Sequence, residues 1–155
     1  MVAGRKKPTW KPINSTFDFN DYPFYWISRV GNRYTHVMEV ELKKVNMNIT
    51  TWRIALILRE LGTLSMTEIA EYAVGRMPTI AKSIYRMSDA GLVTVGLKAS
   101  DGRVTQVSLT KDGVNLIEYV TEKTEKIIDR SFEGMPSAEI KQLNALLKKI
   151  FHNLD

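Results

Sequence analysis

The side chains best suited to chemistry in this sequence are basic, and they are concentrated in two segments. Residues 1–11 carry four basic residues and no acid, and residues 76–103 carry five basic residues against two acidic ones. Lysine and arginine bind phosphate oxygens and also donate to the acceptor atoms of guanine in the major groove of DNA. The clustering predicts a polyanionic partner, since a basic pI that served solubility alone would need no such segregation.

The sequence lacks the ingredients of an active site. Its two histidines, His36 and His152, fall in different predicted helices, and it has neither a glycine-rich phosphate loop nor a His/Asp/Glu cluster at metal-ligand spacing. The absence of cysteine also excludes disulfide bonds and thiolate zinc sites. We therefore expect neither an enzyme nor a bound cofactor.

Length and composition are those of one globular domain. The chain has 155 residues, of which 44% are hydrophobic and 25% are charged. No apolar run reaches the length of a membrane span, and no apolar segment of a secretion signal follows the basic N-terminus. These features predict a cytoplasmic protein without a membrane partner.

The basic residues of the second segment lie in a predicted helix-turn-helix. Ser65 and Glu68 are spaced to form a capping box at the start of one short helix. Gly75 marks the turn that follows, and Pro78 suits the first turn of the next helix. Gly91 is expected to end that second helix in a left-handed conformation.

A predicted hairpin follows the helix-turn-helix, and long helices flank the whole unit. Strands are expected at residues 92–97 and 104–109, with the Asp-Gly pair of residues 101–102 forming the turn between them. Apolar residues recur at helical spacing between residues 22 and 45, after Thr110 and after Pro136. A further helix is expected after Asn48, with Thr50 as its N-cap.

This order of elements, together with several short motifs, resembles the MarR family of bacterial transcription regulators. The motifs that carry the resemblance are Trp52-Arg53, Thr67-Glu68-Ile69-Ala70, Arg86-Met87, Ala90-Gly91-Leu92-Val93, Asp101-Gly102-Arg103, and Leu109-Thr110 with Gly113. The D-x-R of the wing followed by L-T-x-x-G is the specific part, because a Gly-Leu-Val after a helix is common in winged helices. The chain departs from the family at Thr94, Val95 and Gly96, where an arginine is common at the base of the wing.

The resemblance implies a mainly α fold with a small β-wing, in which a winged helix-turn-helix head is joined to long N- and C-terminal dimerisation helices. We expect residues 1–21 to form a flexible, extended basic arm and residues 22–155 to form a single domain. Within that domain the dimerisation helices are expected at 22–48 and 111–155, and the head at 49–110. The resemblance further implies a homodimer on a pseudo-palindromic operator, with a small-molecule pocket between head and dimer layer.

The start of the second helix of a helix-turn-helix presents side chains to base edges, and the wing holds phosphates. The predicted DNA-binding residues are Arg76, Pro78, Thr79, Lys82, Ser83, Arg86, Lys98, Asp101 and Arg103. Asp101 would orient the Arg103 guanidinium through a charge-assisted hydrogen bond. The sequence leaves two alternatives open. The basic side chains of the helix could form a solvated face without a ligand, and the wing could be a surface turn whose ion pair has no role in binding.

Aromatic and basic residues also alternate in the first two long helices. The predicted ligand-binding residues are Trp26, Arg29, Arg33, Trp52 and Arg53. The rings could stack on an aromatic ligand while a guanidinium binds its carboxylate or phosphate. Trp52-Arg53 and Asp21-Tyr22-Pro23 resemble MarR members that control degradation of aromatic acids, which predicts an aromatic acid or its CoA thioester as effector. The alternative left open is that these arginines pair with Glu39, Glu41 or Glu60.

These features predict a ligand-responsive repressor that acts as a homodimer on double-stranded DNA, because a dimer covering a promoter blocks polymerase. The alternative is a winged-helix protein-interaction module without specific DNA binding, which the basic head argues against. Arg5, Lys6 and Lys7 would lie in a minor groove or else add only nonspecific affinity.

Overall fold

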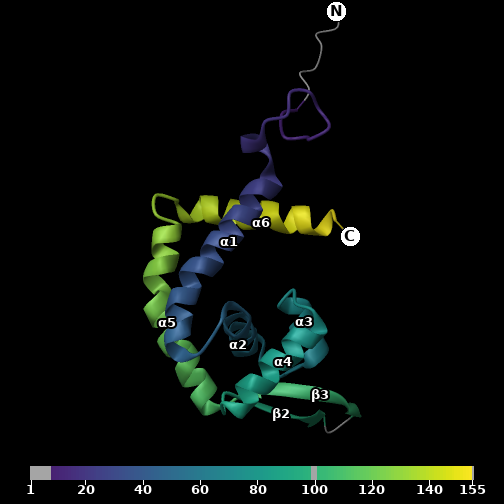
Figure 1. The fold of residues 1–155 in the computed structure, drawn as a ribbon, viewed down its shortest axis with the longest axis vertical. Coiled ribbons are helices and arrows are strands. Elements are labelled where there is room, and N and C mark those ends of the chain that lie inside the picture. Colours follow the sequence, from purple (N-terminus) through teal and green to yellow (C-terminus); the bar gives the residue numbers. More distant parts are fainter. Residues whose placement is uncertain (1–7, 99–100, 155) are drawn as a thin grey trace, which may run out of the picture.

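The computed structural model describes residues 8–98 and 101–154, and in them the predicted mainly helical fold with a small antiparallel sheet is confirmed. Figure 1 shows α1 and α5 along one side of the molecule, with α3, α4 and the sheet at the other side. The helices are α1 (Pro23–Leu42), α2 (Ile49–Leu61), α3 (Met66–Tyr72), α4 (Met77–Asp89), α5 (Lys111–Ser131) and α6 (Ser137–His152). The strands are β1 (Leu64–Ser65), β2 (Val93–Lys98) and β3 (Asp101–Leu109), and short 3-10 helices lie at η1 (Phe19–Asp21) and η2 (Lys43–Val45). No helix in this described part is long and apolar enough to cross a membrane.

The capping box predicted at the start of α3 is confirmed. The Glu68 amide donates to the Ser65 hydroxyl over 3.2 Å, and the Ser65 amide donates to the Glu68 carboxylate over 2.8 Å. The cap predicted for α2 was wrong, because Asn48 occupies the N-cap position. Its side-chain oxygen accepts a hydrogen bond from the Thr51 amide over 2.9 Å. The Thr51 hydroxyl in turn accepts from the Asn48 amide over 2.9 Å, which completes a capping box.

Gly91 ends α4 as predicted, with a φ of 72°. The Leu92 amide donates to the Met87 carbonyl and the Gly91 amide donates to the Ser88 carbonyl, each over 2.9 Å. These two bonds form a Schellman motif, which satisfies carbonyls that the helix end would otherwise leave unpaired. The chain is thereby turned directly into β2.

The wing is the hairpin of β2 and β3. Strand β2 is shifted by one residue from the predicted 92–97, and β3 begins three residues earlier than the predicted 104–109. Val93 pairs with Leu109 and Lys98 pairs with Asp101, with a register shift between Leu97 and Lys98. The Asp-Gly pair therefore belongs to β3 and not to the turn as predicted, because the register shift carries the pairing past residue 97. The short strand β1 was not predicted, since its two residues are too few to show alternation, and it pairs with β3 at Val107.

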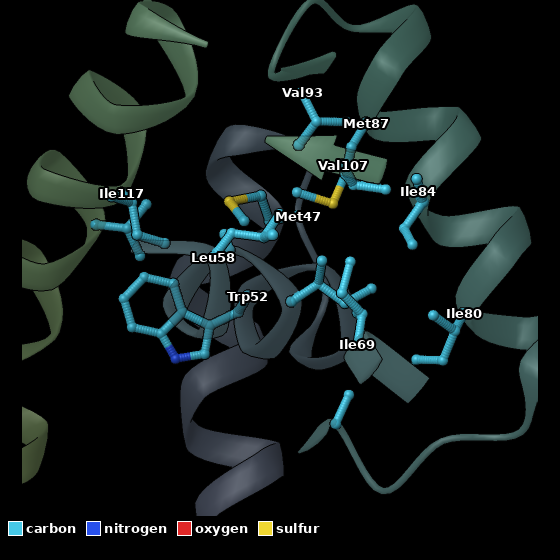
Figure 2. Packing of buried hydrophobic residues seen from close by; sticks show 14 of the residues in the cluster. Met47, Trp52, Leu58, Ile69, Ile80, Ile84, Met87, Val93, Val107 and Ile117 are labelled. Atoms are coloured by element: carbon cyan, nitrogen blue, oxygen red, sulfur yellow. The ribbon is translucent and has the colours of Figure 1, made fainter. Parts of the chain in front are cut away.

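One hydrophobic core holds the head together and anchors α5 to it. Ile80, Ile84 and Met87 of α4 are buried. Figure 2 shows these side chains converging with those of α2, α3, the sheet and Ile117 of α5. Because α5 contributes Ile117 and Val120 to this core, a movement of α5 would disturb the packing of the head.

Within the arm predicted at residues 1–21, the described residues 8–21 contain turns and η1 where the sequence predicted an extended segment. The Asp18 amide donates to the Thr9 carbonyl over 2.9 Å, and the Asp18 side chain caps η1. The Phe19 ring lies 4.1 Å from the Tyr25 ring, centroid to centroid, which holds this segment against the start of α1. The basic residues Arg5, Lys6 and Lys7 fall outside the described residues, so their role stays a prediction.

A substitution in the first turn of α5 tests how tightly the wing and α5 are packed. Gly113 is buried, and a Cβ built there would lie 2.1 Å from the Leu92 carbonyl oxygen. Because backbone lies on both sides of this contact, Gly113→Ala is expected to lower the free energy of unfolding by about 3 kcal/mol. Urea denaturation measures the change. The control is Gly31→Ala in helix α1, where a Cβ would meet no other atom within 4 Å. Because alanine favours a helix more than glycine does, this substitution should stabilise the protein by about 0.5 kcal/mol. Equal stability of wild type and Gly113→Ala would contradict this packing.

Candidate DNA interface and effector cavity

Helix α4 presents one basic face to solvent, opposite its buried face. Arg76, at the N-cap, and Pro78, Thr79, Lys82 and Arg86 are all exposed. None of these side chains contributes to the core, so they remain available to a ligand. The N-terminal half of α4 therefore has the form expected of a helix that enters the major groove.

Ser83 lies on the flank of this face and is half-buried. Its hydroxyl donates to the Thr79 carbonyl over 2.9 Å, one turn earlier in the helix. The hydroxyl oxygen keeps its acceptor capacity, but its donor is already used. Ser83 is thus less suited to reading a base acceptor than its exposed neighbours.

The wing lies next to α4, because β2 packs against that helix (Figure 1). Arg103 is exposed on β3. The side chains of Lys98 and Asp101 lie outside the described part of the structure, so the predicted bond between Asp101 and Arg103 stays a prediction. The backbone nonetheless places both basic wing positions on the hairpin that adjoins α4.

An open cavity of about 1320 Å³ lies between α1 and α5. Its lining residues are Trp26, Arg29, Val30, Asn32, Arg33, Tyr34, His36, Val37, Lys126, Ile127, Arg130 and Ser131. Trp26, Arg29 and Arg33 were predicted to bind a ligand, and the structure brings all three to this cavity. The sequence analysis missed Lys126 and Arg130, although their spacing of four residues places them on one face of α5 beside Ile127.

The cavity is strongly cationic. Two basic residues from α1 and two from α5 line it, and no carboxylate does. In the described ranges, the ion pairs join Lys44 to Glu41 over 2.7 Å and Arg59 to Glu60 over 2.9 Å. Glu41 and Glu60 are therefore paired with other residues and not with the arginines of α1. Four basic side chains that line one cavity with no carboxylate among its lining residues favour an anionic ligand.

Arg29 is positioned by two aromatic rings. Its guanidinium carbon lies 5.3 Å from the Tyr25 ring centroid and 5.7 Å from the Trp26 ring centroid, and it hydrogen-bonds the Tyr25 hydroxyl. The Trp26 indole N–H in turn donates to the Asn20 carbonyl over 2.7 Å. These contacts fix a guanidinium beside an indole face, an arrangement that suits an aromatic ring bearing a carboxylate.

Trp52 and Arg53 do not line this cavity. Trp52 is only 4% exposed and belongs to the core, where its indole Nε1 has no hydrogen-bond partner among the described residues. Arg53 points elsewhere and donates to the Ala73 carbonyl over 3.0 Å, which ties α2 to the end of α3. Successive helical residues project about 100° apart, so one of this pair faces inward and the other does not.

Helix α6 has an apolar face that the protomer leaves uncovered. None of its residues is buried, and Leu143, Leu146, Leu147 and Phe151 are all exposed. Helix α1 likewise exposes Val30. Exposed apolar area of this extent marks an interaction surface.

No family model matches the chain. It is 42% identical over 144 residues to the HTH-type transcriptional repressor IacR of Pseudomonas putida, which covers 93% of this chain and 86% of that protein. Its fold is similar to that of a MarR family transcriptional regulator from Silicibacter pomeroyi, with a TM-score of 0.80 and 22% identity over 88% of this chain and 92% of the other. It is also similar to NadR in complex with 4-hydroxyphenylacetate, with a TM-score of 0.76 and 24% identity over 90% and 97% of the two chains. The chain therefore belongs to the MarR family of DNA-binding transcriptional regulators.

Proposed function

We propose that this regulator is a homodimeric repressor that releases its operator when an anionic aromatic effector occupies the cavity between α1 and α5. The observation that carries the proposal is that cavity, which places four basic residues and an indole together without a carboxylate. The operator is chromosomal DNA in a bacterium, so the protein acts in the cytoplasm.

The DNA-binding part of the proposal rests on α4. Its exposed face offers Arg76, Lys82 and Arg86 to bases and phosphates, and the adjoining wing offers Arg103. Arginine and lysine at the start of a groove-inserted helix bind guanine and position the protein on phosphates. The similarity to a transcriptional repressor over most of the chain supports repression as the outcome.

The dimer part of the proposal rests on α6. Its uncovered leucines and Phe151 would be buried against the same helix and α1 of a second copy. A self-complementary contact of this kind gives two-fold symmetry. Two heads related by that symmetry would meet two half-sites of a pseudo-palindromic operator.

The effector part of the proposal combines shape with charge. An aromatic carboxylate could place its ring on Trp26 and its carboxylate on Arg29 or Arg33, whereas a CoA thioester could also engage Lys126 and Arg130. NadR, a protein of the same fold, was found in complex with 4-hydroxyphenylacetate. We choose the aromatic carboxylate, and its CoA thioester is the alternative ligand that the experiments must distinguish.

Trp52 does not line the proposed effector site, but it lies in the core next to two residues that do. Its buried N–H lacks a partner, which costs about 1–3 kcal/mol until an acceptor is supplied. Tyr34 and Ile127, which line the cavity, pack against the core that contains Trp52. A ligand oxygen that entered between these side chains would satisfy the indole.

Release of DNA follows from the packing of α5. Ile117 and Val120 of α5 are buried in the core of the head, while Lys126 and Arg130 of the same helix line the cavity. A ligand that draws α1 and α5 into a new separation thus moves the head. The shift in operator affinity is limited to the difference in ligand affinity between the two head spacings.

Two substitutions separate base reading from phosphate binding. Lys82→Ala should weaken binding to the operator by roughly 1–3 kcal/mol while leaving binding to random DNA nearly unchanged, because a base contact carries sequence information. Arg103→Ala should weaken binding to all duplexes and reduce the slope of log affinity against log salt, because a phosphate contact releases counterions. Fluorescence anisotropy at several salt concentrations measures both effects. Lys123→Ala, on the exposed surface of α5, is the control. If neither variant changes binding to any promoter fragment, the interface is misassigned.

A further inference from the structure

The turn between α3 and α4 contains a residue in an unfavourable backbone conformation. Val74 has a φ of 51°, and Asn46 is the other non-glycine residue with positive φ in the described ranges. Asparagine adopts this left-handed conformation readily, whereas a β-branched side chain is strained in it. Val74 is also 83% exposed, so burial in the core does not compensate for the strain.

The conformation at Val74 is firmly imposed by its neighbours. The Val74 amide donates to the Glu71 carbonyl over 3.1 Å, and the Gly75 amide donates to the Ala70 carbonyl over 3.0 Å. On the other side of the turn, Arg53 donates to the Ala73 carbonyl. The strain is therefore maintained by hydrogen bonds around it, as at many functional positions.

The glycine of this turn is Gly75 and not the left-handed residue Val74. At position 75 a side chain would collide with α4. A Cβ built on Gly75 would lie 2.6 Å from Cδ1 of Ile80, a buried residue of α4. Nothing comparable requires valine at position 74, where glycine or asparagine would adopt the left-handed conformation without strain. The Val74 side chain thus serves neither the turn nor the core.

Two exposed apolar side chains accompany Val74. Tyr72, at the end of α3, is 56% exposed and Met77, at the start of α4, is 39% exposed. Between them lies Arg76, at the N-cap of the helix assigned to the major groove. The head therefore exposes apolar as well as basic side chains beside the start of α4.

We propose that Val74, flanked by Tyr72 and Met77, makes an apolar contact with thymine methyl groups in the operator and contributes to sequence specificity. The thymine C5-methyl is the apolar feature of the major groove, and small apolar side chains recognise it. Continuity with the exposed face of α4 places this contact at the edge of the DNA interface. The inference rests on the operator binding proposed above.

Removal of the two partners in turn tests the contact. A duplex is selected by the wild-type protein from a randomised library, and a second duplex is made with deoxyuridine in place of thymine, which removes the methyl groups and keeps base pairing. Val74→Gly should bind the thymine duplex on the order of 5-fold more weakly than wild type does. On the deoxyuridine duplex, the variant and the wild-type protein should bind with about the same affinity. Val74→Asn should behave in the same way, since asparagine fits the backbone but lacks the methyl groups.

Thermal unfolding accompanies the anisotropy measurements. Val74→Gly should raise the melting temperature or leave it unchanged, which excludes misfolding as the cause of weaker binding. Asn46→Gly, which alters the other left-handed residue, is the control and should not change DNA binding. Undiminished binding of Val74→Gly to the thymine duplex overturns the proposal and indicates that the turn contacts a protein partner instead. An equal loss of affinity on both duplexes also overturns it and indicates a contact with phosphate. A wild-type protein that selects no duplex at all would instead refute operator binding itself.

Discussion

Substitution of Leu143 and Leu147 together by aspartate is expected to make the protein monomeric and to weaken operator binding by about 10²–10⁴-fold. The two leucines lie one turn apart on the exposed apolar face of α6. In the proposed dimer they are buried, and a carboxylate buried there without a partner prevents association. A monomer then binds one half-site, without the effective concentration that links two heads.

Light scattering and anisotropy titration check this prediction together. Lys148→Asp is the matched control, because it introduces the same side chain on the opposite, polar face of α6 and should remain dimeric. A wild-type mass equal to one chain at micromolar concentration would contradict the dimer. Unchanged operator affinity of a monomeric variant would contradict binding to two half-sites.

Loss of the cavity arginines is expected to abolish the effector response without affecting operator binding in the absence of ligand. Arg29→Gln combined with Arg33→Gln removes the two donors of α1 proposed to bind the carboxylate, and each charge-assisted hydrogen bond contributes about 1.5–3 kcal/mol. The affinity for an anionic aromatic ligand should therefore fall by about 100-fold or more. Lys44→Gln, outside the cavity and paired with Glu41, is the control.

The probes for this experiment are benzoates, cinnamates, 4-hydroxyphenylacetate and the corresponding CoA esters, and thermal stabilisation is the readout. A free acid should depend on Trp26, Arg29 and Arg33, whereas a CoA thioester should depend also on Lys126 and Arg130. A panel in which no member raises the melting temperature would count against the cavity as the effector site. Stabilisation that survives both substitutions would have the same consequence.

The parts of the fold that depend on local chemistry could be predicted from the sequence. Ser65 with Glu68, and Gly91 after α4, are signals whose partners lie within a few residues, so tertiary structure need not be known. The N-cap of α2 was misplaced by two residues because Asn48 and Thr50 are both good caps, and only packing decides between them. The N-terminal segment lacks periodicity, and its order comes from contacts such as Phe19 with Tyr25.

The same distinction applies to the candidate site. The residues of α4 that we propose to face DNA lie on one helix, so spacing alone separates them from buried Ile80 and Ile84. The cavity is different, because Arg33 and Arg130 meet only when α1 packs against α5, nearly a hundred residues later in the chain. Trp52 and Arg53 were predicted to bind the same ligand as the residues of α1. Because consecutive residues of a helix project about 100° apart, their side chains point in different directions.

A protection footprint on the intergenic DNA beside the gene tests the central claim most directly. The account predicts two protected half-sites whose centres lie about one helical turn, roughly 10 base pairs, or a multiple of it apart. Protection should weaken with Lys82→Ala and disappear at the same protein concentration with Leu143→Asp/Leu147→Asp. Absence of protection by the wild-type protein, or a single half-site bound equally well by the monomeric variant, would contradict a dimer that reads DNA through α4.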